Sequence, residues 1–233
     1  MMKKPVDYSG FSLRKLGQPR FRHILLSLGW IGYFLMYVLT ENLIPAEKCH
    51  PIHIFLDDLI PFNEYFAVFY VAWYALIFFS LLFSLLYDVE KFKHMQKFII
   101  VTQVVAMACY ILWPSRQDLR PEQFPRENVF TWLMGFIYSV DTPTGVCPSL
   151  HVAYSLGVLS ADLKDREMGR LWKALLTLLV VMISVSVCFV KQHSALDVLT
   201  ALPLGLLAEL LVYGKDWWLP RLRGEGRKPH GGK

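Results

Sequence analysis

The chain alternates long apolar stretches with short polar segments. Six stretches are almost free of charge, at residues 24–40, 65–87, 98–115, 145–161, 174–190 and 198–214, and only the last contains an acidic residue, Glu209. Each approaches the roughly 17 to 25 residues that an α-helix needs to cross a hydrocarbon core about 30 Å thick. The pattern therefore predicts six transmembrane helices.

The segments between these stretches differ in kind. Residues 114–126 contain three prolines, which interrupt backbone pairing, so we expect an irregular loop there. Asn128 can cap a helix over residues 129–139, whose aromatic side chains suit a membrane interface. We expect a short interfacial helix before the fourth span. His50 and His53 in the first polar loop lack matching ligands, so we predict neither a metal nor another cofactor.

Composition supports a membrane location. The 233 residues are 55% hydrophobic and 18% charged, whereas soluble domains are about 25% charged. The sequence thus predicts an all-α integral membrane protein with three parts: a basic N-terminal segment over residues 1–22, a six-helix catalytic domain over 23–214 and a basic tail over 215–233. Residues 224–233 are expected to be disordered.

The basic residues are distributed unevenly between the two sides of this topology. If the N-terminus is cytoplasmic, most of the 24 lysines and arginines lie in cytoplasmic segments, as the positive-inside rule requires. Both termini are then cytoplasmic in a multi-pass protein of the cell membrane. We interpret the basic ends as solvated or lipid-facing and expect no nucleic-acid partner. The opposite side holds only Lys48, Arg116, Arg120, Arg126 and Lys191.

His193 and Asp197 carry the clearest chemical pattern. They are four residues apart, so they share one face if the sixth helix begins before His193. An aspartate that accepts from one imidazole nitrogen fixes the tautomer and leaves the other nitrogen as a nucleophile or base. A purely structural pair would show the same spacing, and that alternative stays open.

A second candidate lies at the start of the fourth span. Pro148 suits the first position of a helix, and the free amides of the first turn, with the hydroxyl of Ser149, can hold phosphate oxygens. His151 would lie beside them as a proton donor. The alternative is an ordinary helix start with an incidental histidine. The predicted topology brings His151 and His193 to the same extracytoplasmic face.

Phosphoryl transfer also needs positive charge around the phosphate oxygens. Arg120, Arg126 and Lys191 lie on the same side as the two histidines and can supply it. Arginine suits this role because its planar fork holds two oxygens at once. Each of the three could instead be a solvated loop charge.

At these positions the chain resembles the type 2 phosphatidic acid phosphatase superfamily, whose motifs read KxxxxxxRP, PSGH and SRxxxxxHxxxD. Arg120 and Pro121 match the end of the first motif, residues 148–151 match the second with Leu150 in place of glycine, and His193 and Asp197 match the third. The resemblance covers roughly residues 20–215. Two basic motif positions are missing, because Trp113 and Val187 stand there.

The resemblance implies a mechanism. His193 would attack phosphorus, Asp197 would orient it, and His151 would protonate the leaving alcohol, with Ser149 and Leu150 at the phosphate and no metal. The expected substrate is a lipid phosphate or pyrophosphate in the bilayer.

Two other functions compete with the phosphatase. Residues 193–198 also resemble the HYTIDV segment of sphingomyelin and inositol phosphorylceramide synthases, so a lipid phosphotransferase is the first alternative. A noncatalytic lipid-binding or transport protein is the second. The sequence leaves the lipid, the acceptor and the oligomeric state open.

Overall fold

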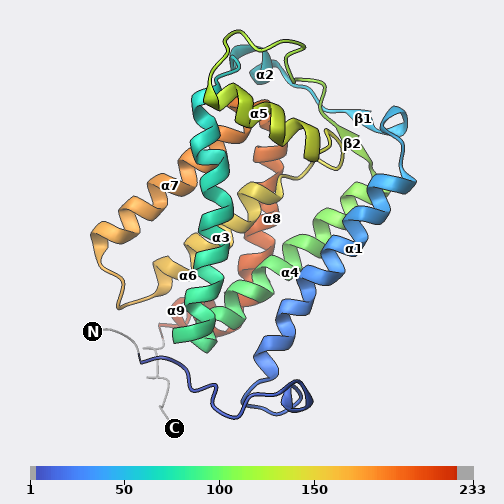
Figure 1. The fold of residues 1–233 in the computed structure, drawn as a ribbon. Helices are drawn as coiled ribbons and strands as arrows, with labels where there is room; N and C mark the ends of the chain where they lie inside the picture. The colour runs from blue at the N-terminus through green and yellow to red at the C-terminus, as the bar shows by residue number, and fades with distance from the viewer. Residues whose placement is uncertain (1–3, 225–233) are drawn as a thin grey trace.

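The fold is a bundle of α-helices, seen in a computed structural model that describes residues 4–224 (Figure 1). Five helices are long: α1 (Leu28–Leu43), α3 (Ala67–Tyr87), α4 (Val89–Leu112), α7 (Arg170–Phe189) and α8 (Ala195–Tyr213). Four are shorter: α2 (Phe55–Leu59), α5 (Val129–Val140), α6 (Leu150–Lys164) and α9 (Leu219–Leu222). Short 3-10 turns at Leu13–Lys15, Arg22–Ser27, Ala46–Lys48 and Glu64–Phe66, and a π-helical turn at Gly214–Trp218, complete the helical elements.

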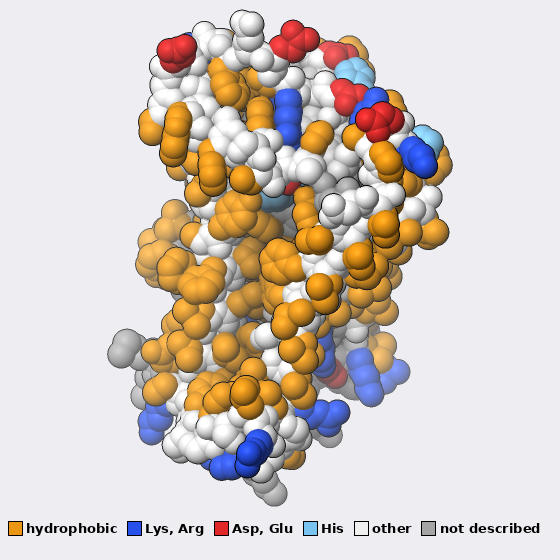
Figure 2. All heavy atoms as spheres, turned by 45° about the vertical axis from the view of Figure 1, so that its right-hand side comes forward, with side chains coloured by type: hydrophobic (Ala, Val, Ile, Leu, Met, Phe, Trp, Pro, Cys, Tyr) orange, Lys and Arg blue, Asp and Glu red, His pale blue; other side chains and the backbone are white. Residues whose placement is uncertain are grey.

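Five helical stretches in the described part of the chain are long and apolar enough to cross a membrane. They are Arg22–Thr40, Glu64–Tyr87, Val89–Leu112, Arg170–Phe189 and Ala195–Leu222. They overlap five of the six stretches that the sequence predicted, so the expectation of an all-α, multi-pass membrane protein is confirmed. Large apolar side chains cover the sides of the bundle, where they would face lipid (Figure 2).

The fourth predicted span is different. Its helix, α6, has 15 residues and begins at Leu150 rather than at residue 145. At 1.5 Å per residue it is about 22 Å long, shorter than a 30 Å hydrocarbon core. Pro148 therefore precedes the helix instead of occupying its first position. Helix α6 is enclosed by α3, α4, α7 and α8, and about half of its residues are buried.

Small side chains let the neighbouring helices approach α6 closely. Ala153, Gly157 and Ala161 recur every fourth residue on one face of this helix, and all three are buried. A Cβ atom at Gly157 would lie 2.7 Å from a ring carbon of Phe98 on α4, closer than two such atoms can pack. Glycine at this position is therefore required by the contact between α4 and α6.

Ion pairs join the helices at the end of the bundle that holds α9, called here the α9 end. Lys91 on α4 pairs with Asp162 and Asp165 at the end of α6. Lys164 lies 2.6 Å from Glu209 of α8, which also accepts hydrogen bonds from Ser160 and Trp218. The sequence offered no role for Glu209; the structure places it in this network, where each buried charge has a partner.

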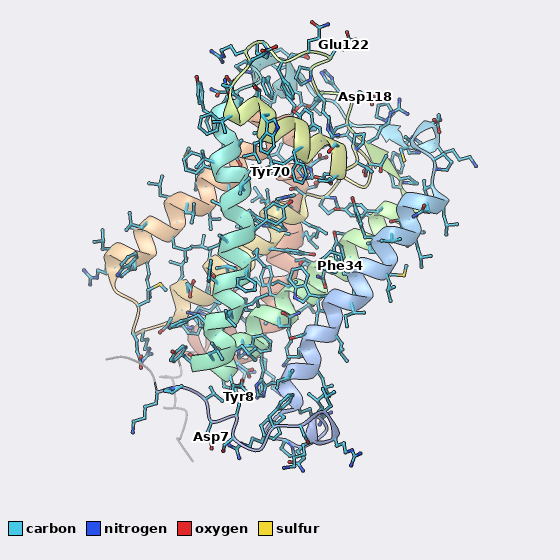
Figure 3. All side chains as sticks on the ribbon, in the orientation of Figure 1. Asp7, Tyr8, Phe34, Tyr70, Asp118 and Glu122 are labelled. Carbon is cyan, nitrogen blue, oxygen red and sulfur yellow. The ribbon has the colours of Figure 1, made fainter. Side chains whose placement is uncertain are left out.

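The opposite end, called here the α5 end, is built from the loops. Helix α5 lies across it, capped by Asn128, whose side chain accepts from the amides of Phe130 and Thr131 as predicted. The loop over residues 114–126 was expected to be irregular, but β2 (Ser115–Arg116) pairs in parallel with β1 (His50–Pro51). Figure 3 shows Asp118 and Glu122 at this end and Asp7 and Tyr8 at the α9 end.

The close contact at Gly157 yields a stability test. Replacing Gly157 with alanine forces the ring of Phe98 aside, and overpacking of this kind costs about 1–3 kcal/mol. We expect a lower midpoint of thermal unfolding in detergent for Gly157→Ala. Gly32→Ala on α1 is the matched control, because a Cβ there meets no atom within 4 Å. Equal midpoints for the two variants would contradict the packing described here.

Candidate functional site

The His193 and Asp197 side chains meet at the start of α8. The Nδ1 atom of His193 lies 3.1 Å from Oδ2 of Asp197, and the carboxylate is fully buried. The helix begins at Ala195, after His193, so the predicted helical face is not what pairs them. Asp197 instead closes a capping box with Ser194, whose backbone amide donates to the same Oδ2 over 3.0 Å. The helix cap thus orients the imidazole.

His151 reaches the same place from the first turn of α6. The centroids of its ring and the His193 ring are 5.5 Å apart. Two aromatic rings of α3 pack on His151, with the centroid of Trp73 at 4.2 Å and that of Tyr70 at 4.7 Å. Its Nε2 atom is buried and has no hydrogen-bond partner within residues 4–224. Most buried polar atoms in proteins have a hydrogen-bond partner, so this nitrogen is free to bind a ligand or water.

Backbone contacts hold the two helix starts together. The amide of Ser149 donates to the carbonyl of Asp197 over 3.0 Å, which joins the N-cap of α6 to the first turn of α8. The hydroxyl of Tyr110 donates to the carbonyl of Pro148 over 2.7 Å and fixes the same turn to α4. The positions of the two histidines therefore depend on one shared backbone junction.

Arg120 lies beside the histidines. Its guanidinium donates to the Gln192 side chain over 2.6 Å and to the Asp141 carbonyl over 2.8 Å, and it stacks on the ring of Tyr138 at 4.5 Å. Its Nε atom has no hydrogen-bond partner in the described residues. Burial lowers the pKa of Arg120 and the nearby Asp141 carboxylate opposes that shift, so the group stays a cation.

The other two predicted basic residues have partners elsewhere. Arg126 forms a two-pronged pair with Glu64, at 2.8 and 3.1 Å, and hydrogen bonding to that carboxylate raises its pKa. Lys191 is buried, and its ammonium donates to the backbone carbonyls of Asp57 and Ile60. Both residues hold the α5 end together, and neither lines the cavity that contains the histidines.

Two predicted phosphate contacts remain near His151. The hydroxyl of Ser149 is buried, and no hydrogen-bond partner for it occurs within residues 4–224. Leu150, which stands where the motif has glycine, is buried and lines the cavity. Of the predicted residues, His151, His193 and Leu150 line the cavity. Asp197, Arg120 and Ser149 lie behind it, where Asp197 pairs with His193, Arg120 donates to Gln192 and Ser149 is the N-cap of α6. Arg126 and Lys191 are held by other partners.

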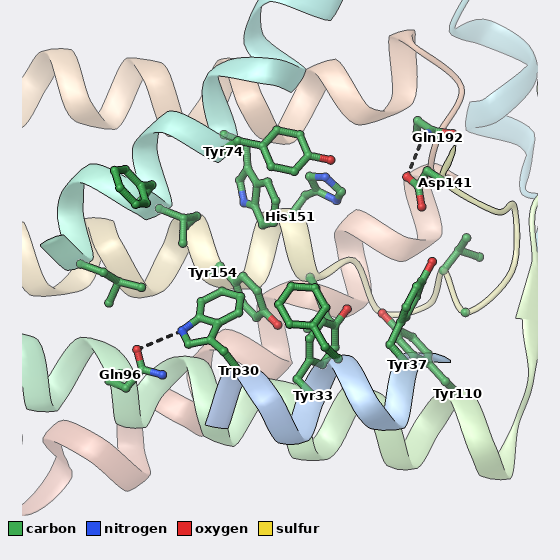
Figure 4. Close-up of a pocket in the computed structure, with 18 of the residues that line it drawn as sticks. Trp30, Tyr33, Tyr37, Tyr74, Gln96, Tyr110, Asp141, His151, Tyr154 and Gln192 are labelled. Carbon is green, nitrogen blue, oxygen red and sulfur yellow. Dashed lines mark hydrogen bonds between the residues drawn. The ribbon is translucent and has the colours of Figure 1, made fainter. Parts of the chain in front are cut away.

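The cavity has a volume of about 660 Å³ and extends between α1 and α3. Figure 2 shows apolar side chains on both sides of the hollow, and Figure 4 shows how aromatic rings line it. Asp141 and Gln192 lie at one end near His151, joined by a hydrogen bond of 2.9 Å. Ligand cavities of this size are common and combine an apolar wall with a few polar groups.

Several residues of the site carried no signal in the sequence. Asp141 accepts from the Tyr70 hydroxyl over 3.1 Å and from Gln192, forming a polar group beside Arg120. Asp57, on α2, accepts from the hydroxyl of Ser194 over 2.6 Å and from the amide of Ala195 over 2.7 Å. No local pattern indicates these contacts, because their partners are far apart in the chain.

Neither a search for metal ligands nor comparisons with known proteins assign a function to this site. In the stretch from residue 4 to residue 224, no group of three or more histidine, cysteine, aspartate or glutamate side chains is arranged to hold a metal ion. Comparisons with protein-family models, with curated proteins and with solved structures find no match. The case for a function therefore depends on the geometry and on the motif residues themselves.

The contacts of Asp57 predict its effect on stability. Asp57→Ala leaves the hydroxyl of Ser194 and the start of α8 without their acceptor, and such losses cost about 1–3 kcal/mol. We expect a lower midpoint of thermal unfolding for this variant. Asp58→Ala is the control, since Asp58 is exposed and its ion pair with His53 is exposed too. If the midpoint fell equally in Asp58→Ala and Asp57→Ala, the hydrogen bonds of Asp57 would not explain its effect on stability.

Proposed function

We propose that the protein is a membrane-embedded phosphatase for lipid phosphates or pyrophosphates that works through a phosphohistidine intermediate. The observation that carries the proposal is the meeting of His151 with the His193 and Asp197 pair in an apolar cavity between membrane-type helices. Paired histidines with a carboxylate behind one of them suit nucleophilic and acid-base catalysis. The surrounding apolar wall suits a substrate that resides in lipid.

Each residue has a part in the proposed reaction. Asp197 accepts from Nδ1 of His193, so Nε2 carries the lone pair that attacks phosphorus. The bond from phosphorus to the lipid oxygen breaks, and His151 donates a proton to that oxygen. Water then attacks the phosphohistidine while His151 takes a proton from it, which releases phosphate and restores both rings.

The spacing of the two rings agrees with this scheme. In-line transfer needs the nucleophile on one side of phosphorus and the acid at the leaving oxygen on the other side. Two imidazole rings with centroids 5.5 Å apart can both reach one phosphoryl group.

The phosphate oxygens need partners, and the structure favours some candidates over others. We propose that these partners are Arg120, the hydroxyl of Ser149 and the free backbone amides of the first turn of α6, which begins at Leu150. It does not use Arg126 or Lys191, whose charged groups are held by Glu64 and by backbone carbonyls. Arg120, the basic residue of the first motif that this chain retains, then carries the positive charge at the phosphate.

The proposal includes an orientation in the cell membrane. We infer that α6 acts as a short sixth span whose first turn opens at the extracytoplasmic side, with α5 at the interface. Both chain ends are then cytoplasmic, which agrees with the excess of basic residues near the α9 end. The substrate would enter from the bilayer.

Two variants test the chemistry. His193→Ala removes the nucleophile, so we expect a fall in kcat/KM of at least about 1,000-fold with any substrate. His151→Ala removes the proton donor of the first step and the base of the second, so alkyl phosphates should lose about 100-fold or more. A nitrophenyl phosphate ester needs no proton on its leaving group and should lose less than about tenfold in the first step. Release of phosphate by purified protein measures turnover, and release of nitrophenol within the first turnover measures the first step.

The outcomes separate the proposal from its alternatives. His50→Ala is the control, because His50 lies on β1 and stacks on Trp113, away from the cavity. A new phospholipid without free phosphate would identify a phosphotransferase. Unchanged activity in both His151→Ala and His193→Ala would leave only a noncatalytic role for the site.

The orientation has its own test. A cysteine replacing Glu122 at the α5 end should react with an impermeant maleimide in intact cells, whereas a cysteine replacing Asp7 should react only after the cells are opened. Both positions are exposed, so access to the reagent depends on the side of the membrane alone. The reverse order of labelling would show that the site faces the cytoplasm.

A further inference from the structure

The cavity continues past the histidines as a groove between α1 and α3. Both helices contribute residues at helical spacing, so each presents a single stripe to it. The stripe of α1 comprises Trp30, Tyr33, Phe34 and Tyr37. The stripe of α3 comprises Trp73, Tyr74, Ile77, Phe78, Leu81, Leu82 and Leu85. Figure 4 shows aromatic rings from both sides of this groove, with His151 between them.

The groove is long compared with one leaflet of a membrane. From Trp73, which packs on His151, to Leu85 the helix rises about 18 Å at 1.5 Å per residue. Half of a hydrocarbon core about 30 Å thick is about 15 Å. A chain that began at the histidines and filled the groove would therefore pass the middle of the bilayer.

The two ends of the groove differ in polarity. The end at the histidines carries Asp141 and Gln192, and the buried nitrogen of Trp73 has no hydrogen-bond partner among the described residues. Toward the α9 end the walls are apolar except at Ser27 and Gln96. The oxygen of Gln96 accepts from Trp30 over 3.3 Å and its nitrogen donates to a backbone carbonyl, so this amide is satisfied. The groove therefore has one polar end and one apolar end.

The side of the groove is open to lipid. Phe34, Tyr74 and Phe78 line it, yet 57%, 51% and 60% of their surfaces are exposed. Helices α1 and α3 both pack on α4, which forms the floor through Phe92 and Gln96. A molecule dissolved in the bilayer can thus enter sideways between α1 and α3, without crossing water.

We propose that this groove seats one long hydrocarbon tail of the substrate, with the phosphate at the histidines and the tail directed toward the α9 end. The inference rests on the proposed function and names its substrate class: lipid phosphates or pyrophosphates with a single long alkyl or isoprenoid chain. With carbon–carbon bonds of about 1.5 Å, an extended chain advances about 1.3 Å per carbon, so about 14 carbons fill the groove. One stripe on each helix leaves room for one chain, and a diacyl lipid would keep its second tail outside.

Leu81 offers a way to shorten the groove. It lies about 12 Å along α3 from Trp73, so a larger side chain there would stop a tail after about nine carbons. We therefore compare Leu81→Trp with Leu86→Trp. Leu86 is on the same helix, is partly exposed and does not line the groove, so its replacement adds the same bulk outside it.

The experiment measures kcat/KM for alkyl monophosphates with tails of about 8 and about 16 carbons, lengths that fall on either side of Leu81. We expect the ratio of long-tail to short-tail activity to fall at least tenfold in Leu81→Trp and to stay at the wild-type value in Leu86→Trp. Phosphatidic acid with tails of the longer length should be a poorer substrate than the single-tailed phosphate. An unchanged ratio in Leu81→Trp, or equal falls in both variants, would overturn the inference, and a preference for phosphatidic acid would overturn the single-tail assignment.

Binding without turnover separates this inference from the proposed function. A nonhydrolysable alkylphosphonate with the longer tail should raise the midpoint of thermal unfolding of the wild type and of Leu86→Trp, and raise it less in Leu81→Trp. If that pattern appears but no phosphate is released from any ester, the groove binds the tail as inferred and the phosphatase proposal fails. If phosphate is released but the phosphonate stabilises all three proteins equally, the inference that the groove binds the tail is wrong and the phosphatase proposal is supported.

Discussion

The hydrogen bond from the Ser149 amide to the Asp197 carbonyl is the contact on which the site depends. It joins the starts of α6 and α8, helices that bring His151 and His193 from positions 42 residues apart in the chain. Asp197 uses its backbone for this bond and its carboxylate for the capping box and for His193. One residue therefore fixes both the approach of the helices and the orientation of the imidazole.

Contacts at the α5 end hold the chain segment that leads into this junction. Asp57 of α2 accepts from Ser194 and Ala195, and Lys191 donates to the carbonyls of Asp57 and Ile60, so the segment just before α8 is held against α2. In a chain surrounded by lipid, polar groups must find partners within the protein. Nine buried side-chain atoms lack one in the described residues; those of His151, Ser149, Arg120 and Trp73 lie around the histidines, whereas that of Tyr213 lies toward the α9 end. The imidazole nitrogen of His151 is one such atom in a residue that lines the cavity beside His193, so a polar ligand bound there could supply its partner.

Sequence reasoning predicted the long helices because length and apolar composition are local properties of a span. It also placed His151, His193 and Arg120 on one side, because helix order decides which ends share a face. It could not assign Arg126 and Lys191, since their partners, Glu64 and the end of α2, are distant in the chain.

The details of helix starts were harder to predict. Helix α8 begins after His193, and α6 begins two residues after Pro148, because caps rather than apolar runs decide where a helix starts. The length of α6 was overestimated for the same reason. The apolar run that precedes it continues through a turn containing Gly145, whose φ of 60° cannot belong to a right-handed helix.

Covalent catalysis by His193 is the central claim, and trapping the intermediate tests it most directly. Purified protein would be mixed with a lipid phosphate labelled at phosphorus, quenched within one turnover and separated from free lipid. We predict label bound to the protein that is lost in acid, is retained in alkali and is absent from the His193→Ala variant. Turnover without bound label in the wild type, or bound label that persists in His193→Ala, would contradict the account.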